Sequence, residues 1–176
     1  MMIPVNRNPK FNASINPKFN ASINPKFNAS INPKFNASIN PKFNASINPK
    51  FNSSINPRFT PRINPSYTPG INPKFNASIN PRFNASINPN VTANMQALLV
   101  YDLNVSPISF AVELPGKVGY ILYNYQLTAE GYCFSDGGKG FVVFNMNMEN
   151  IGYWSPTEKG FNWFDNSAEW IYFIIK

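Results

Sequence analysis

A column of basic residues is the clearest chemical feature of this sequence. Lysine or arginine returns at one position of an eight-residue repeat, and each is followed directly by an aromatic residue. Cations that alternate with aromatic rings are typical of polyanion-binding surfaces, because cations neutralise phosphates and rings stack on bases. The candidate polyanion-binding residues are Lys10, Lys18, Lys26, Lys34, Lys42, Lys50, Arg58, Lys74 and Arg82.

The same column also has a purely structural explanation. A cation at each corner of a repeated fold keeps the surface soluble and blocks the pairing of exposed strand edges. We favour this explanation here, because the neighbouring phenylalanine serves better as part of a core than as a stacking platform. Binding of a nucleic acid or an acidic polysaccharide is therefore the alternative function.

The charge is distributed unevenly over the 176 residues. The net charge is +7, but residues 1–96 hold eleven lysines and arginines and no acidic residue, whereas residues 97–176 hold four basic and eight acidic residues. Such asymmetry indicates two parts with different partners. The chain has no histidine and one cysteine, Cys133. An intrachain disulfide, a zinc site built on histidine and cysteine, and a Ser–His–Asp or Cys–His nucleophile are thereby excluded.

Other side chains that could support chemistry are few. Glu158 and Asp165 could form an acid–base pair, but nothing in the sequence brings them together. The glycine-rich segment SDGGKG lacks the spacing of a phosphate-binding loop and is explained by a hairpin turn. We therefore expect no enzyme activity, no catalytic residue, no metal site and no cofactor.

Two tryptophans are candidate carbohydrate-binding residues. Trp154 and Trp163 flank the turn SPTEKG in a region rich in tyrosine and phenylalanine, and aromatic rings on a β-sheet can stack against sugar rings. Membership of a core is the commoner fate of such residues. A carbohydrate-binding module is the second alternative function. The repeated Asn-x-Ser triplets are formal glycosylation acceptors, and they could instead form a regular surface that meets a glycan.

The octad INPKFNAS divides into a predicted strand and a predicted corner. Asn-Pro occurs eleven times, from residue 8 to residue 89, without an insertion or deletion. An even period keeps the alternation of a strand in phase, so Phe, Ala and Ile of FNASI would share a buried face. Asn-Pro favours a turn, and proline at this spacing excludes a helix. Stacked octads of this kind predict a β-solenoid, with a fibre-like spiral and disorder as alternatives.

The second half changes character and predicts antiparallel strands. Hairpin turns are expected at Pro115–Gly116 and around Asp136–Gly138. The predicted fold class is all-β, with an octapeptide-repeat β-solenoid over residues 1–93 and a small antiparallel β domain over residues 94–176. That domain would either carry recognition or cap the open end of the solenoid.

The function that this organisation favours is non-enzymatic. The repeat would act as a rigid spacer or assembly surface, and the C-terminal domain would recognise a partner or cap the stack. The partners considered are a polyanion, a glycan, and other copies of the chain through the solenoid edges. No secretory signal or apolar segment of 18 residues is visible, so we expect a cytoplasmic protein by default.

Overall fold

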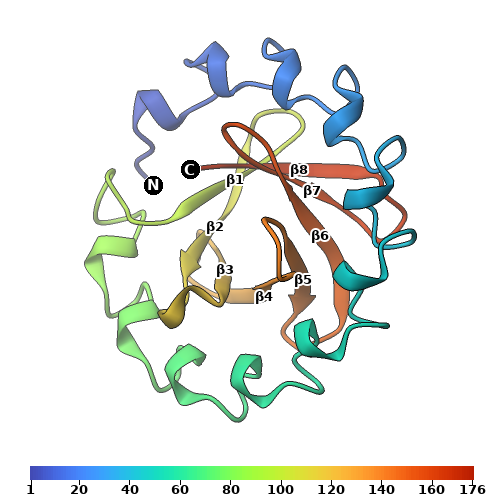
Figure 1. The fold of residues 1–176 in the computed structure, drawn as a ribbon. Helices are drawn as coiled ribbons and strands as arrows, with labels where there is room; N and C mark the ends of the chain where they lie inside the picture. Colours follow the sequence, from blue (N-terminus) through green and yellow to red (C-terminus); the bar gives the residue numbers. More distant parts are fainter.

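The computed structural model describes all residues from 1 to 176 and consists of a ring that surrounds a barrel. The repeat region runs once around the molecule as a chain of short helical turns, which we call the belt (Figure 1). The second half forms a closed eight-stranded β-barrel inside the belt. The two parts share one apolar core, to which isoleucines of the belt and side chains of the barrel both contribute.

Each octad of the belt contains two consecutive turns. In the first, Asn16 accepts hydrogen bonds at its carbonyl oxygen from the backbone N–H groups of Phe19 (2.9 Å) and Asn20 (2.8 Å). In the second, the side chain of Asn20 caps a single turn of 3₁₀ helix by accepting a bond from the N–H of Ser22 (3.0 Å). These helices are η1 Val5–Arg7, η2 Ala13–Ile15, η3 Ala21–Ile23, η4 Ala29–Ile31, η5 Ala37–Ile39, η6 Ala45–Ile47, η7 Ser53–Ile55, η8 Pro61–Ile63, η9 Pro69–Ile71, η10 Ala77–Ile79 and η11 Ala85–Ile87.

Asparagine amides also tie each octad to the one before it. The side-chain N–H of Asn24 donates to the carbonyl of Pro17 (2.8 Å), and that of Asn20 donates to the carbonyl of Ser14 (2.7 Å). Thr60 and Thr68 replace the second asparagine of their octads, and their hydroxyls still donate to the preceding octad, as Thr60 does to Ser53 (2.7 Å). An asparagine side chain offers an acceptor and two donors, so one residue both caps a turn and links two octads.

The predicted β-solenoid is wrong. The FNASI segment forms no strand, because asparagine and serine side chains bond to the local backbone and compete successfully with a β ladder. Its phenylalanine and alanine are exposed, and only the isoleucine turns towards the barrel. Without strands the belt has no solenoid edge, so self-association through such edges has no basis. The all-β class is confirmed by the barrel, but the barrel is enclosed by the repeat and does not cap it.

The belt closes on itself. The backbone N–H of Met2 donates to the carbonyl of Pro89 at 3.0 Å, which joins the segment before the first octad to the last octad. Arg7 strengthens this junction, since its guanidinium donates to the carbonyls of Met95 and Ala97 while its own carbonyl accepts a bond from the hydroxyl of Tyr101 (2.8 Å). Burial lowers the pKa of Arg7.

The barrel is a simple antiparallel meander in which every strand pairs with its sequence neighbours and β8 pairs with β1. The predicted turns at Pro115–Gly116 and Asp136–Gly138 lie between β2 and β3 and between β4 and β5. The strands are β1 Leu98–Asp102, β2 Pro107–Glu113, β3 Gly119–Asn124, β4 Ala129–Ser135, β5 Phe141–Asn145, β6 Asn150–Pro156, β7 Gly160–Phe164 and β8 Trp170–Ile175, with the 3₁₀ turn η12 Pro115–Lys117 between β2 and β3.

Four similar hairpins build this barrel. Each turn starts with an Asp or Asn whose side chain accepts bonds from two backbone N–H groups, as Asp102 does from Asn104 (2.9 Å) and Ser106 (2.8 Å). Three residues after that Asp or Asn, a non-glycine residue adopts a left-handed conformation, as Val105 does with φ 68°. The equivalent first residues are Asp102, Asn124, Asn145 and Asp165, which lie 22, 21 and 20 residues apart.

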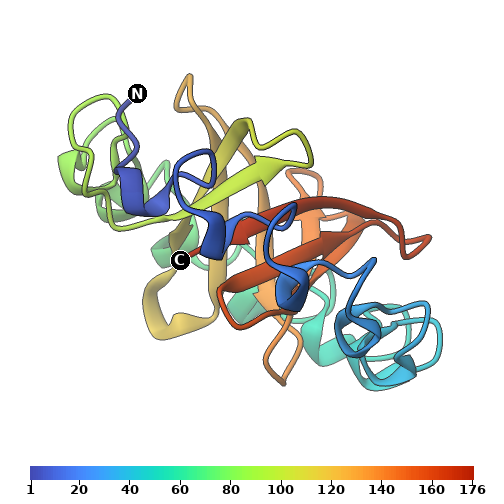
Figure 2. The ribbon, with the colours of Figure 1, turned by 90° about the horizontal axis from the view of Figure 1, so that it is seen from above.

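The two faces of the strands have different roles. One face, which includes Tyr101, Phe110 and Phe144, packs against the belt isoleucines. The other face fills the barrel with a second cluster that includes Cys133 and Trp154. Turned by 90°, the hairpin loops of the barrel extend to both sides of the belt (Figure 2). The belt thus supplies the outer wall that covers the apolar exterior of the barrel.

Candidate functional site: the outer rim of the belt

Aromatic side chains project from the belt into solvent at regular intervals. Nine of them follow a basic residue and Tyr67 follows Ser66, and their exposed fractions lie between 71% and 77%. Single exposed apolar side chains are common on protein surfaces, but here ten rings recur at one position of the repeat. We call this array, together with the basic column beside it, the rim. Its aromatic residues are Phe11, Phe19, Phe27, Phe35, Phe43, Phe51, Phe59, Tyr67, Phe75 and Phe83.

The backbone beneath each rim pair is held in place by hydrogen bonds. The side chain of Asn24 accepts a bond from the N–H of Lys26 (2.9 Å), and its carbonyl accepts one from the N–H of Phe27 (3.0 Å). Pro25 fixes the first dihedral angle of this turn. Each cation and its neighbouring ring are therefore carried on a rigid turn. Less conformational entropy of the belt is then lost when a partner binds.

The structure places all nine candidate basic residues on the exposed surface of the belt. Two of them also contact the barrel: Lys34 forms an ion pair with Glu169, and Arg82 donates from Nε to the carbonyl of Leu127 at 3.3 Å. The other seven have no ion-pair partner. Ser66 and Asn90 take the basic position in two octads. Because residues 1–96 hold no acidic side chain, the rim is positive around almost its whole circumference.

The two candidate tryptophans lie inside the barrel. Trp154 is 1% exposed and Trp163 is 7% exposed, and their ring centroids are 6.1 Å apart. Their faces are occupied by each other and by aromatic neighbours such as Phe161 and Tyr172. The structure therefore offers neither ring face to a sugar at the surface.

Ionisable groups outside the rim are dispersed or buried. Burial raises the pKa of the Cys133 thiol, which keeps this sulfur protonated in the barrel core. The exposed carboxylate of Glu158 accepts hydrogen bonds from Ser22 and Asn20 of the belt, and these lower its pKa. No three His, Cys, Asp or Glu side chains cluster to form a metal site. The charged groups thus position the belt on the barrel and do not converge on one point.

The aromatic residues of the rim are what the sequence interpretation missed. The signal was present, since each ring follows a cation within an Asn-Pro turn, but the alternating pattern assigned these rings to a core. No helix of the structure has the length and apolar character needed to cross a membrane. No protein-family model matches the chain, and neither a curated protein nor a solved structure matches it.

Proposed function

We propose that the protein binds single-stranded nucleic acid, or a chemically similar flexible polyanion with flat rings, along the outer rim of the belt. The observation that carries the proposal is the outward position of ten aromatic rings, each beside a cation or, at Tyr67, beside Ser66. The main objection to this function was that the phenylalanines were needed for a core. Their exposure removes that objection.

The chemistry of the rim suits a nucleotide chain. Lysine and arginine neutralise phosphates, and a phenylalanine face stacks on a base at about 1–3 kcal/mol per base, with little dependence on sequence. The repeat offers the same pair of groups in nearly every octad. Several weak contacts along one strand then act together, because each bound nucleotide holds the next one near its own octad.

The shape of the rim selects a flexible partner. The belt is a closed convex ring, so a flat membrane or a stiff duplex would meet only a few octads at a time (Figure 1). Duplex DNA has a persistence length of about 50 nm, far above the size of a small domain, whereas a single strand bends at every nucleotide. A single strand can therefore follow the rim and engage successive octads.

Closure of the belt disfavours the spacer function that the sequence suggested. A spacer keeps two ends apart, but Met2 and Pro89 are joined by a backbone hydrogen bond of 3.0 Å. A chain whose two ends meet cannot hold two partners apart, but its outer circumference is available for binding. The non-enzymatic character of the protein stays a prediction.

A salt titration tests the proposal. Fluorescein-labelled oligothymidylate is titrated with the protein at low ionic strength, and the anisotropy titration is repeated at increasing salt. We expect log Kd to rise with log salt by about 0.7 for each phosphate contacted. Duplex DNA and heparin serve as comparisons, and both should bind more weakly than the single strand because they offer no accessible bases.

Three results would overturn the proposal. One is the absence of binding at low salt. Another is equal affinity for heparin and oligothymidylate, which would leave the rings without a role. The third is tighter binding to vesicles of phosphatidylcholine and phosphatidylserine than to the single strand, which would assign the rim to a membrane surface.

A further inference from the structure

One extra residue interrupts each even-numbered strand of the barrel, shortly after its hairpin turn. In β2, Val100 pairs with Ser109 and Tyr101 pairs with Pro107, so Ile108 has no partner in the register. Such β-bulges redirect a side chain and are common at the rims of barrels. Each bulge follows one of the four similar hairpins, so all four lie at the same end of the barrel, which we call the bulge end. The extra residues are Ile108, Glu130, Ile151 and Ile171.

These four residues line a hollow of about 470 Å³ at the bulge end. The buried side chains of Leu122 and Trp163 also line it, together with the partly exposed Tyr172. No belt residue contributes to its walls, and Ile151 is 39% exposed. Pockets of about 300–1,000 Å³ with mostly apolar walls are typical of small-ligand sites, and the mouths of β-barrels are a common place for them.

Glu130 is the exception in this otherwise apolar ring of bulge residues. It takes the position that isoleucine holds in the other three hairpins, and it is the only charged residue that lines the hollow. Its exposed carboxylate accepts one hydrogen bond from the side-chain amide of Asn124 (3.1 Å) and forms no ion pair. A carboxylate can accept several bonds, so Glu130 retains the capacity to accept from a bound donor.

The charges of the barrel are segregated between its two ends. The bulge end holds five of the eight acidic residues within 97–176, namely Asp102, Glu130, Glu149, Asp165 and Glu169. The opposite end holds all four lysines of this region, namely Lys117, Lys139, Lys159 and Lys176. A hollow surrounded by charges of one sign raises the local concentration of ions of the other sign. The bulge end therefore favours a cation.

The chain itself places no cation in the hollow. Two belt cations reach the bulge end, but Lys34 pairs with Glu169 and Arg82 donates to a hairpin carbonyl, and neither lines the hollow. At the opposite end the chain does supply a cation, since the ammonium of Lys176 lies 5.4 Å from the centre of the Phe161 ring. That distance is typical of a cation–π contact. The bulge end offers aromatic and carboxylate groups without an equivalent lysine.

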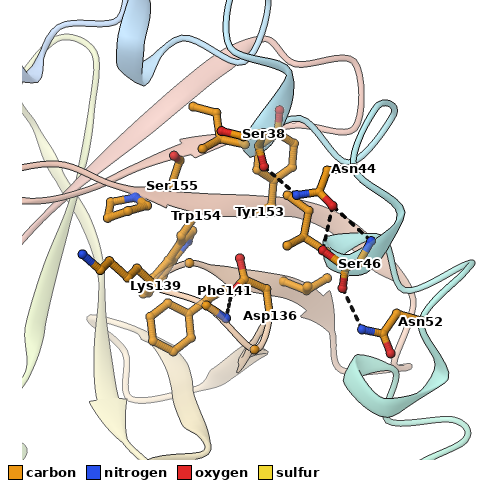
Figure 3. A pocket seen from close by; sticks show the side chains of 17 residues that line it. Ser38, Asn44, Ser46, Asn52, Asp136, Lys139, Phe141, Tyr153, Trp154 and Ser155 are labelled. Carbon is orange, nitrogen blue, oxygen red and sulfur yellow. Dashed lines mark hydrogen bonds between the residues drawn. The ribbon is translucent and has the colours of Figure 1, made fainter.

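A larger hollow between the belt and strands β5 and β6 has a different character (Figure 3). Its volume is about 550 Å³, but its polar belt residues bond to one another. Ser46 donates to Asn44 at 2.6 Å, and Asn52 donates to the carbonyl of Ser46 at 2.6 Å. Asp136 and Lys139 give this hollow both signs of charge. It therefore indicates no class of ligand, whereas the hollow at the bulge end has apolar walls and one sign of charge.

We propose that the hollow at the bulge end binds a small organic cation, an ammonium group on a compact apolar body. The body packs against Ile151, Ile171 and Tyr172, and the ammonium donates to the carboxylate of Glu130. A neutral molecule would leave that carboxylate without a new partner, and an anion would be repelled by the acidic residues around it. The hollow shares no residue with the rim, so this site is independent of the proposed nucleic-acid binding.

The test uses the full chain at 0.15 M salt with one amine and two relatives of similar shape. Phenethylamine carries the ammonium, 2-phenylethanol carries a hydroxyl in its place, and 3-phenylpropionate carries a carboxylate. Saturation-transfer NMR detects binding, and chemical-shift titration gives the dissociation constants. We expect phenethylamine to bind in the low-millimolar range or tighter. The alcohol should bind about 3- to 5-fold more weakly, the range of one exposed ion pair, and the carboxylate should not bind measurably.

Three variants locate the effect. Glu130→Gln should lower the affinity for phenethylamine to that for 2-phenylethanol and leave the alcohol unaffected. Ile171→Ser should weaken the binding of both. Glu149→Gln is the matched control, because Glu149 also accepts from its hairpin asparagine, Asn145 (2.7 Å), but lies outside the hollow. Salt screens such distant charges, so this variant should bind phenethylamine as the wild type does.

Four results would overturn the proposal. The first is no detectable binding of phenethylamine, and the second is equal affinity for the amine and the alcohol. The third is a Glu130→Gln variant that binds the amine as tightly as the wild type. The fourth is an equal loss of affinity in Glu149→Gln and Glu130→Gln, which would assign the effect to the overall charge of the bulge end and not to a contact in the hollow.

Discussion

The belt repeats its sequence almost without change, whereas the barrel repeats its structure with little sequence identity. In the belt, Asn16 and Asn20 each cap a turn and also bond to the preceding octad, so a substitution breaks two kinds of contact at once. In the barrel, the ladder of main-chain bonds holds the hairpins, and only the first residue of each turn has a fixed side-chain role. A repeat held by side chains therefore tolerates only residues that keep these bonds, such as Thr60 in place of asparagine, and one held by backbone is free of this constraint.

The largest effect should come from removing one complete octad. Deletion of residues 40–47 removes one whole octad and leaves the turns of the other octads intact. The belt then becomes shorter than the circumference of the barrel that it encloses. We expect loss of either the Met2–Pro89 closure or the contacts of several isoleucines, at a cost of about 4 kcal/mol or more in the free energy of unfolding. Urea denaturation followed by circular dichroism measures this cost.

A control for that deletion is one added glycine after Gly137, in the exposed turn between β4 and β5. Loop tips of the barrel should tolerate this insertion with little change in stability. Equal stability of the octad deletion and the wild type would show that the belt does not close around the barrel.

Two isoleucines at the same position of the octad should differ strongly. Ile71 is 3% exposed within the shared core, so Ile71→Ala should cost about 2–5 kcal/mol of unfolding free energy. Ile47 is only half-buried, so Ile47→Ala should cost less than about 1 kcal/mol. Thermal denaturation of both variants gives the comparison, and similar losses would mean that the belt packs evenly around the barrel.

Two tyrosines at equivalent barrel positions offer a finer comparison. Tyr132→Phe leaves the carbonyl of Ile71 without its donor and should cost about 1 kcal/mol of unfolding free energy. Tyr153→Phe removes an unpaired buried hydroxyl, so stability should be unchanged or slightly higher. Chemical denaturation measures both free energies of unfolding. A larger loss of stability for Tyr153→Phe than for Tyr132→Phe would contradict the hydrogen bond from Tyr132 to the belt and its absence at Tyr153.

Part of this structure follows from local signals in the sequence. The period of eight, the Asn-Pro turns and the hairpin turn at Pro115–Gly116 all depend on residues close together in the chain. Apolar alternation in FNASI predicted a strand, but a turn of 3₁₀ helix forms there. Asparagine and serine side chains make hydrogen bonds to the local backbone, and apolar periodicity carries no information about these bonds.

The barrel repeat was visible but faint. Asp102, Asn124, Asn145 and Asp165 each stand before a turn that contains an apolar left-handed residue, yet their spacing varies by one residue each time. The fit of the belt around the barrel could not be predicted, since it depends on contacts between residues distant in the sequence, such as Ile71 with Tyr132. The hydroxyl of Tyr153 makes no such contact, and the unchanged octads beside it give no sign of this difference.

Replacement of rim residues should change the stability of the protein least of all these substitutions. It should change the affinity for single-stranded nucleic acid most. A variant with Phe19, Phe27 and Phe35 changed to alanine removes three rings that are 75–77% exposed. Its free energy of unfolding should stay within about 0.5 kcal/mol per substitution. A matched variant with Lys18, Lys26 and Lys42 changed to glutamine removes three cations without an ion-pair partner.

The most direct test measures the affinity of these two variants for oligothymidylate and for heparin, together with their melting temperatures. We expect the phenylalanine variant to lose at least about tenfold in affinity for the single strand, from lost stacking, while its affinity for heparin is unchanged. The lysine variant should lose affinity for both ligands and show a shallower salt dependence. Unchanged oligothymidylate binding by the phenylalanine variant would contradict the role of the rim, and a sharp fall in its melting temperature would contradict the exposed position of its rings.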